Sequence, residues 1–586
     1  QAGLADPAAG SVLSVAESLT NLVWAPLSEG LDSVSLSANW MWPCRSQKGE
    51  DARLYRGVEA LSDFCCAIRV NVPTGKDSLS MTQKYPDGKK VVSPGTVIVS
   101  AGGEVSDVRK VVSPVIKQEK STLYHIDFSF DELRLGASAF AQSLGFVGSD
   151  VPTVKNPDYF RDAFNAVQEL VKRGLLLAGH DVSAGGLITC LLEMCFANTE
   201  GGLEISLDGF KKADLVKALF AENPGVVVQV ADKDKAAFKE VLDAAGIAYV
   251  KLGKPVEERH ILVEKDGATY QFGIDYLRDV WYETSYLLDT KQSFNGCAKQ
   301  RYENYKQQPV EFHFHPEFKG TFESYGITPE RRTPSGVRAA IIREKGTNGE
   351  REMAYVLYLA GFDVKDVMMT DLISGRETLD DINMIVFCGG FSNSDVLGSA
   401  KGWAGAFLYN PKAKAALDRF YAREDTLSLG VCNGCQLMVE LNLINPEHKK
   451  RSRMLHNNSH KFESAFLGVT VTTNRSVMFG SLSGDQLGIW VAHGEGKFDL
   501  PLPEDRYNVV LKYNYDSYPG NPNGSSYNVA GIASPDGRHL AMMPHLERAF
   551  FPWQNAYYPA DRLADDVTPW VEAFVNARKW VEAHRK

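Results

Sequence analysis

The stretch GVCNGCQ, residues 430–436, places two cysteines, Cys432 and Cys435, three positions apart. Such a pair can exchange disulfides, bind zinc, or contain one nucleophile. A thioredoxin-like redox motif lies near the start of its fold, whereas this one follows several strand-like and helix-like segments. A zinc site needs a second cysteine pair or a histidine pair at fixed spacing, and no such pattern accompanies it. The arrangement therefore favours a single nucleophile.

Cys432 is the better candidate for that nucleophile. It follows an apolar run, precedes a helical one, and has glycines at positions 430 and 434. This is the layout of a nucleophile elbow, a sharp strand-to-helix turn that exposes the reactive side chain. The helix N-terminus favours the thiolate, and the backbone N–H of Asn433 points to where an oxyanion would form. Cys435 lies one turn into the helix, so we interpret it as a small core residue.

A nucleophilic cysteine needs a base, and the base needs a group that orients it. The segment HLAMMPHLERAF supplies His545 and Glu547 just after a predicted strand. Residues i and i+2 of an extended segment face the same side, so Glu547 can hold the ring of His545. The sequence therefore predicts a Cys432–His545–Glu547 triad. His493, in VAHGEGKF, is the rival base, but the glycines around it are more typical of a binding loop.

A second group of polar residues lies far upstream. Glu17 and Asn21 are one turn apart in a predicted helix over residues 11–23, so they project from one face. With Asp181 they would supply the oxygen ligands that Mg²⁺ prefers, although these residues alone favour a helix with two solvated side chains. Lys76, in TGKDS, can contact a phosphate or lie on an exposed turn, and both interpretations stay open.

The elements that must position the cysteine begin at residue 336. Predicted strands VRAAIIR, DVKDVMM, INMIVFCGG and TLSLGV alternate with predicted helices EREMAYVLYLAGF, PKAKAALDRFYAR and NGCQLMVELNL. This alternation predicts a doubly wound, mostly parallel sheet, in which ligands bind at the carboxyl ends of strands. Cys432 follows one such end.

Upstream of that sheet, two further regions are predicted. Segments between residues 121 and 264 alternate in the order expected of a layered α/β domain, including a strand over GLLLAG. Residues 290–335 show no hydrophobic period and predict a linker. We interpret His313 and His315 there as surface or linker histidines, because no third metal ligand is visible nearby.

Composition excludes several classes of function. The net charge is −10 and the basic residues are scattered, which argues against a nucleic-acid partner. No run of eighteen apolar residues is present, so no membrane span is expected. Nine cysteines without a disulfide-like framework favour a reducing cytoplasm. The first residues carry neither an initiator Met nor a signal-peptide pattern, which indicates a cut inside a longer chain or a processed end.

Two motifs together identify a family. GVCNGCQ followed by MPHLE resembles the class I (triad) glutamine amidotransferases, whose cysteine matches Cys432 and whose His-x-Glu matches His545 and Glu547. REKGTNGEREMA, MTDLISGRETLDD, CGGFSNSDVLGSAKGWA, VAHGEGKF and NPNGS are similar to the glutaminase domain of large-type formylglycinamide ribonucleotide amidotransferases. DPAAGSVLSVAESLTN, LSANWMW, GEDARLY, VPTGKDSLSM and HDVSAGGL resemble the second synthetase half of those enzymes. The resemblance covers nearly the whole chain.

The resemblance implies an architecture. An aminoimidazole ribonucleotide synthetase-like half of two α+β domains, 1–118 and 119–295, would be followed by a linker, 296–335. A flavodoxin-like, doubly wound parallel-sheet glutaminase domain would occupy 336–586. The first synthetase half of such enzymes has no counterpart here, so this chain would be about half of the enzyme and the missing N-terminal half its partner.

The resemblance also implies an activity. Glutamine hydrolysis would supply ammonia, through a buried channel, for the ATP-dependent conversion of formylglycinamide ribonucleotide to formylglycinamidine ribonucleotide in purine synthesis. L-glutamine, that ribonucleotide and ATP would be the small-molecule partners. The residues expected to bind glutamine or its oxyanion are Gly389, Gly390, Asn433, Gln436 and His493.

A nucleotide site is implied in the synthetase-like half. Glu17, Asn21 and Asp181 would bind Mg²⁺, Ser183 and Lys76 would contact the nucleotide, and the site would hold ADP in a largely structural role. Where relatives read D-R-S-D-G-G, this chain reads Asp181-Val-Ser183-Ala-Gly-Gly, which replaces two charged residues by apolar ones. Two other functions compete with this hypothesis: a cysteine hydrolase on a similar sheet, and a non-catalytic assembly and nucleotide-binding fragment.

Overall fold

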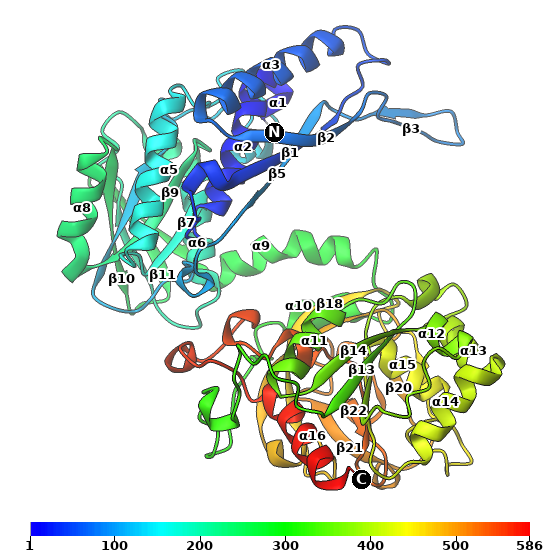
Figure 1. The fold of residues 1–586 in the computed structure, drawn as a ribbon. Coiled ribbons are helices and arrows are strands. Elements are labelled where there is room, and N and C mark those ends of the chain that lie inside the picture. Colours follow the sequence, from blue (N-terminus) through cyan, green and yellow to red (C-terminus); the bar gives the residue numbers. More distant parts are fainter. Residues whose placement is uncertain (1, 586) are drawn as a thin grey trace. The chain divides into compact units, whose positions relative to one another are not determined.

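A computed structural model describes residues 2–585 of the chain (Figure 1). The chain divides into two compact units, Gln1–Trp281 and Tyr282–Lys586, and each is described by itself. Within the described residues, no helix combines the length and the apolar character that crossing a membrane requires.

The first unit begins with helices on a small sheet. Helix α2 (Pro7–Leu22) starts at Asp6, whose carboxylate accepts the N–H groups of Ala8 and Ala9, and it packs on α3 (Glu50–Ile68). Strand β1 (Val34–Met41) pairs in parallel with β2 (Asn71–Ser78) and antiparallel with β5 (Thr96–Gly103). The helix predicted over residues 11–23 is thus confirmed, and it exposes Glu17 and Asn21 on the face that meets β5.

A seven-stranded mixed sheet forms the rest of this unit, in the order β12-β11-β8-β10-β6-β9-β7. Its strands are β6 (Ser121–Asp127), β7 (Ala178–Val182), β8 (Gly202–Ser206), β9 (Gly225–Ala231), β10 (Tyr249–Val256), β11 (His260–Lys265) and β12 (Ala268–Gly273). Its longer helices are α5 (Pro157–Lys172), α6 (Gly186–Phe196) and α8 (Lys235–Ala244), and α9 (Ile274–Asp289) follows the last strand. The predicted layered α/β arrangement is confirmed.

One strand of this sheet begins later than its apolar pattern predicts. The stretch GLLLAG was expected to be extended throughout, but β7 starts only at Ala178. Gly174 and Leu175 instead end helix α5, because their N–H groups donate to the carbonyls of Val171 and Leu170. The shift places Asp181 inside β7 and leaves Ser183 in the turn before α6.

The second unit contains a nine-stranded sheet, in the order β14-β13-β15-β16-β23-β22-β21-β18-β19. Its first five strands are parallel: β14 (Asp363–Met368), β13 (Arg338–Arg343), β15 (Met384–Phe387), β16 (Leu427–Val431) and β23 (His539–Met542). In chain order they read 2-1-3-4-5, the order of flavodoxin-like sheets. Helices α11 (Glu350–Leu359), α12 (Met369–Ser374), α13 (Lys401–Tyr409), α14 (Pro411–Ala422), α15 (Asn433–Glu440) and α16 (Trp570–His584) belong to the same unit. The predicted doubly wound sheet is confirmed.

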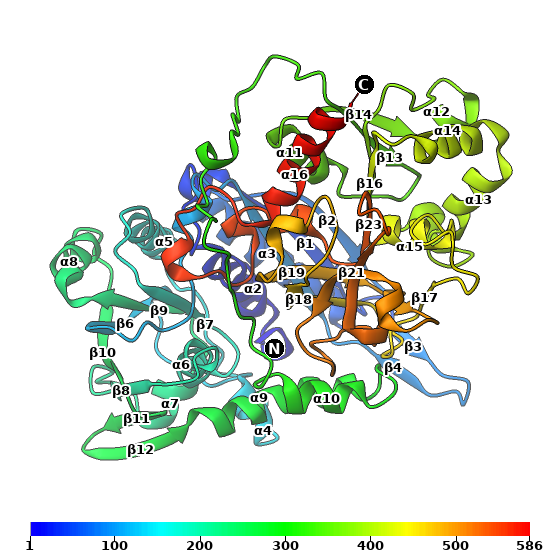
Figure 2. The same cartoon turned by 90° about the horizontal axis from the view of Figure 1, so that it is seen from below.

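The sheet continues with four antiparallel strands that the sequence patterns did not predict. They are β22 (Val529–Ala533), β21 (Asn508–Tyr513), β18 (Glu463–Val471) and β19 (Gln486–His493). Figure 2 shows β18 and β19 next to β21 in this unit. The extension bears on function because β19 ends at His493.

Residues 282–335 belong to the second unit and include helix α10 (Cys297–Asn304). His313 is exposed, as expected, whereas His315 is partly buried between two carboxylates. The Nδ1 of His315 lies 2.8 Å from Asp485 Oδ2, and its Nε2 lies 3.0 Å from Glu572 Oε1. Both carboxylates come from residues far along the chain, so no local pattern reveals them.

Candidate active site

Cys432 lies between strand β16 and helix α15, at the predicted turn. Its backbone has φ 53° and ψ −107°, a conformation that non-glycine residues rarely adopt. Gly434 allows the helix to approach β15 closely, because a Cβ atom there would lie 2.0 Å from the carbonyl oxygen of Phe387. The strained backbone and the close packing are those of a nucleophile elbow.

His545 and Glu547 follow strand β23, whose neighbour in the sheet is β16. The Nδ1 of His545 lies 2.7 Å from Oε1 of Glu547, and the two side chains are 2% and 1% exposed. A Cβ atom on Gly389 would lie 2.8 Å from Cε1 of His545 and 3.4 Å from Cβ of Cys432, so both residues meet at this glycine. Nε2 of His545 is buried and has no hydrogen-bond partner among the described residues. The fold therefore brings the three predicted triad residues together.

The electrostatics of His545 follow from this burial. Burial alone lowers the pKa of an imidazole, but the carboxylate of Glu547, together with Cys432, raises the pKa of His545 to about 10. The ring is consequently a cation at neutral pH and can donate a proton. Cys435, by contrast, is fully buried in α15, and burial raises the pKa of its thiol well above the ordinary value.

The predicted oxyanion residues line the same turn. Asn433 is the first residue of α15, and the N–H groups of a first helical turn have no partner inside the helix. Its buried side chain accepts the N–H of Ser392 at 3.1 Å, which ties the segment after β15 to the elbow. Gly390 has φ +116° and would clash with Gly346 if it carried a Cβ atom. Gly389 contacts both His545 and Cys432, as described above.

The two predicted glutamine-binding side chains have different surroundings. Both polar atoms of the Gln436 amide have partners inside the protein. Its Nε2 donates to the carbonyl of Glu495 at 2.8 Å, and its Oε1 accepts a hydrogen bond from Nδ2 of Asn433 at 3.0 Å. His493 lies at the end of β19, is 2% exposed, and contacts Asn457 through Nδ1. Burial, and then the charge of His545, lower the pKa of His493 to about 3. His493 is therefore neutral at pH 7, and its low pKa makes it a much weaker base than His545.

Asn457 is a residue that the sequence patterns missed. It is fully buried before β18, and its side chain bonds to His493, Lys461 and Gly496. Its only sequence signal is its place in the run NNSHKFE, which by itself predicts an exposed turn.

The predicted magnesium ligands also converge, within the first unit. Nδ2 of Asn21 lies 3.3 Å from Oδ2 of Asp181, linking α2 to β7. The protein around Glu17 removes part of its hydration, and this loss, with the charges of Asp181 and Glu222, raises the pKa of its carboxyl group. Glu17, Ser183 and Glu222 line a cavity of about 290 Å³. The sequence patterns missed Glu222, which no motif marks.

Two observations bear on the predicted nucleotide site. Among residues 2–585, no three His, Cys, Asp or Glu side chains form a metal-binding group. Lys76 lies on the exposed strand β2, where its ammonium group contacts Ser78, and it does not line the cavity. Lys76 is exposed, and its contact with a phosphate stays a prediction.

Three family models match the chain. Residues 336–581 match the CobB/CobQ-like glutamine amidotransferase domain, residues 1–104 match the FGAR-AT PurM_N-like domain, and residues 128–265 match the C-terminal domain of AIR synthase related protein. The amidotransferase match contains Cys432, His545 and Glu547. The two other matches contain the residues predicted for the nucleotide site.

Curated relatives match over nearly the whole chain. Probable phosphoribosylformylglycinamidine synthase, chloroplastic/mitochondrial, of Arabidopsis thaliana is 38% identical over 606 residues, which cover 99% of this chain and 42% of the relative. Phosphoribosylformylglycinamidine synthase of Homo sapiens is 38% identical over 609 residues, which cover 98% of this chain and 45% of the relative. A solved structure of PurLQS from Thermotoga maritima is 25% identical, covers 42% of this chain and 99% of that one, and has a TM-score of 0.32.

The chain spans less than half the length of these curated relatives. Within that span, the amidotransferase and synthetase-like matches follow the division into two units described above. The chain belongs to the phosphoribosylformylglycinamidine synthase family and carries that family's glutamine amidotransferase domain.

Proposed function

We propose that the second unit hydrolyses L-glutamine to glutamate and ammonia. The observation that carries this proposal is the strained Cys432 elbow beside a buried His545–Glu547 pair whose N and O atoms are 2.7 Å apart. A nucleophile, a base and a group orienting that base are the parts that acyl transfer requires. In the intact protein, the ammonia would serve the ATP-dependent conversion of formylglycinamide ribonucleotide to formylglycinamidine ribonucleotide.

The first half-reaction forms a thioester. Cys432 attacks as the thiolate, its Sγ forms a bond to the side-chain amide carbon of glutamine, and the carbonyl oxygen gains a negative charge. N–H groups of Asn433 and of the Gly389–Gly390 turn would stabilise that oxyanion, each by roughly 3 kcal/mol. His545 donates a proton to the amide nitrogen, the C–N bond breaks, and ammonia leaves.

The second half-reaction releases glutamate. His545, now neutral, takes a proton from a water molecule that attacks the thioester carbon. The C–S bond breaks, and the sulfur leaves as the thiolate. Glu547 stabilises the imidazolium in both half-reactions, which the raised pKa of His545, about 10, supports.

We further propose that the first unit binds an adenine nucleotide with Mg²⁺. Glu17, Asn21 and Asp181 would hold the cation, and Ser183 would contact the nucleotide. The residues fit such an ion, because Glu17 lies close enough to other carboxylates for their charges to raise its pKa. The amide of Asn21 would have to turn its oxygen toward the ion, since its nitrogen now donates to Asp181. When bound, Mg²⁺ would neutralise charge on the nucleotide phosphates.

ATP, the ribonucleotide and the part of the relatives' length outside this chain are the proposed partners of the intact protein. A cytoplasmic location remains a prediction, which the nine unpaired cysteines support.

The first test is covalent labelling with an electrophilic glutamine analogue, followed by peptide mapping. Cys432 alone should be modified, and excess glutamine should protect it. The variants Cys432→Ala and Cys435→Ala form a matched pair: the first should lose labelling and glutamine hydrolysis, and the second should keep both. Equal reaction of both cysteines with any alkylating agent, together with a disulfide between them, would make the pair a redox motif instead.

A further inference from the structure

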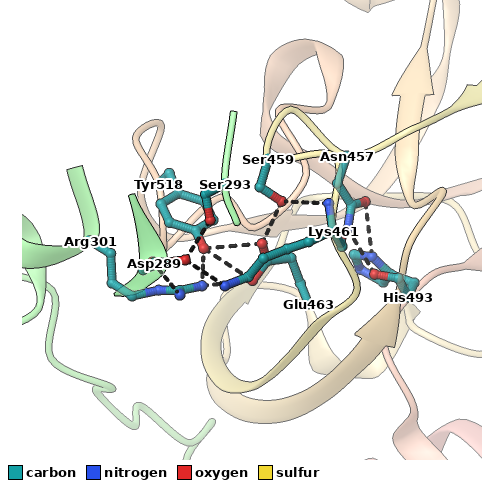
Figure 3. Close-up of polar contacts among 9 residues, drawn as sticks. All are labelled: Asp289, Ser293, Arg301, Asn457, Ser459, Lys461, Glu463, His493 and Tyr518. Atoms are coloured by element: carbon teal, nitrogen blue, oxygen red, sulfur yellow. Dashed lines mark hydrogen bonds and ion pairs between the residues drawn. The ribbon is translucent and has the colours of Figure 1, made fainter. Parts of the chain in front are cut away.

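The amide of Asn457 has only one possible orientation. Its Nδ2 lies 2.7 Å from the carbonyl oxygen of His493 and 3.0 Å from that of Lys461, and carbonyl oxygens can only accept (Figure 3). Its Oδ1 accepts the backbone N–H of Gly496 at 3.0 Å. Exchanging the nitrogen and the oxygen would break all three bonds, so Oδ1 faces His493.

This orientation fixes the proton on His493. Nδ1 of His493 lies 3.2 Å from Oδ1 of Asn457, which can only accept, so Nδ1 carries the hydrogen. A neutral ring with hydrogen on Nδ1 presents a bare lone pair at Nε2. That Nε2 is buried and has no hydrogen-bond partner among the described residues. Such a buried acceptor is costly unless a ligand satisfies it.

His493 lies beside the proposed nucleophile. The carbonyl oxygen of the preceding residue, Ala492, accepts the thiol of Cys432 at 3.4 Å. The charge of His545 reaches the ring of His493 and disfavours its protonation. One site thus holds two histidines with opposite abilities, a donor at His545 and an acceptor at His493.

We propose that Asn457 is a positioning residue that holds His493 in this form, so that Nε2 accepts an N–H of the glutamine side-chain amide. The proposal rests on the glutaminase function proposed above. The amide nitrogen carries two hydrogens, and after the C–N bond breaks the ammonia still offers one to Nε2. The carboxylate of the product glutamate has none, so the same acceptor favours substrate over product.

A cluster of charges holds the loop that carries Asn457. Nζ of Lys461 lies 2.7 Å from Oδ1 of Asp289, at the end of α9. Glu463 pairs with Arg301 of α10 at 2.8 Å and accepts the hydroxyl of Ser459 (Figure 3). The segment from 457 to 463 is therefore fixed at both ends.

The first arm of the test measures the tautomer directly, in the full chain. Heteronuclear NMR of protein labelled at histidine distinguishes Nδ1–H, Nε2–H and the cation, and the spectrum of a His493 variant assigns the signal. We expect His493 to be neutral and protonated at Nδ1 from pH 6 to 8. A cation, or the Nε2–H form, would overturn the proposal.

The second arm replaces His493 by two amides whose side chains differ in length by one methylene group. His493→Gln can place an oxygen acceptor near the position of Nε2, whereas His493→Asn can keep the bond to Asn457 but has no acceptor there. We expect kcat/KM for glutamine to fall about tenfold or more in His493→Asn and to recover largely in His493→Gln. The exposed His313→Asn is the matched control and should behave as the wild type.

The outcomes separate this inference from the proposed function. If His493→Asn keeps wild-type activity while Cys432→Ala loses it, Nε2 of His493 does not act as an acceptor, but the glutaminase function stands. Hydrolysis that persists in Cys432→Ala would refute the glutaminase itself. If both His493 variants lose activity equally while the tautomer is as expected, the ring is needed for its shape and the acceptor role is wrong.

Discussion

Replacing Glu547 by glutamine removes the charge that keeps His545 protonated while preserving the size of the side chain. In the native protein the carboxylate lies 2.7 Å from Nδ1 of His545. Without it, burial is opposed by Cys432 alone, and we expect the pKa of His545 to fall from about 10 toward its ordinary value of 6.5. The imidazole would then be a weaker proton donor to the leaving ammonia.

The magnitude follows from the shift. From 6.5 to about 10 is roughly 3.5 pKa units, which corresponds to ~5 kcal/mol at 1.36 kcal/mol per unit. Both side chains are almost fully buried, so solvent screening reduces this little. Cys432 supplies part of the shift, and we assign Glu547 about 2–4 kcal/mol. By analogy with other triads, kcat should fall ~10³–10⁴-fold.

The sign of the pH dependence is fixed by the same shift. Because the folded pKa lies above the unfolded value, the stabilisation is fully present below about pH 6.5 and disappears as pH rises toward about 10. The free energies of unfolding of wild type and Glu547→Gln should therefore differ most near pH 6 and converge at high pH.

Histidine NMR titration measures the pKa of His545, and calorimetry at pH 6 and 9.5 measures the stability. A covalent adduct of the glutamine analogue should shift only the unfolding transition of the second unit, which assigns that transition. His545→Gln assigns the resonance and serves as the control for the titration. An unchanged titration in Glu547→Gln, or a stability difference independent of pH, would refute the reasoning.

Three further predictions test other parts of the structure. Gly389→Ala puts a Cβ atom 2.8 Å from the His545 ring, so kcat for glutamine should fall ~100-fold as the ring moves, and unchanged kinetics would contradict this. Arg301→Ala leaves Glu463 buried without its partner and should destabilise the second unit by ~3 kcal/mol in calorimetry, whereas an unchanged transition would show that the pair contributes nothing. Glu17→Ala should weaken retention of Mg²⁺–ADP in equilibrium dialysis and leave active-site labelling intact, and lost labelling at native-like stability would contradict separate roles for the two units.

The chemistry of the candidate site was predictable because its signals are local. A cysteine between glycines at a strand-to-helix junction specifies the elbow, and a histidine and a glutamate two positions apart specify the pair. The alternation of strands and helices predicted the parallel part of the sheet, since each strand and helix carries its own period. The Glu17–Asn21 spacing likewise needed only one helix.

Other features depend on pairings between distant segments, and only the tertiary structure decided them. The register of β18 on β19 sets Glu463 opposite His493, thirty residues away, and no periodicity encodes which strands pair. The same pairing brings Asn457 to His493 and thereby selects the tautomer of that ring. The contacts of His315 could not be predicted for the same reason, because its two carboxylate partners lie far along the chain. Sequence alone determined which residues can do chemistry, while long-range pairing determined their protonation, because charge and hydrogen-bond partners act through space.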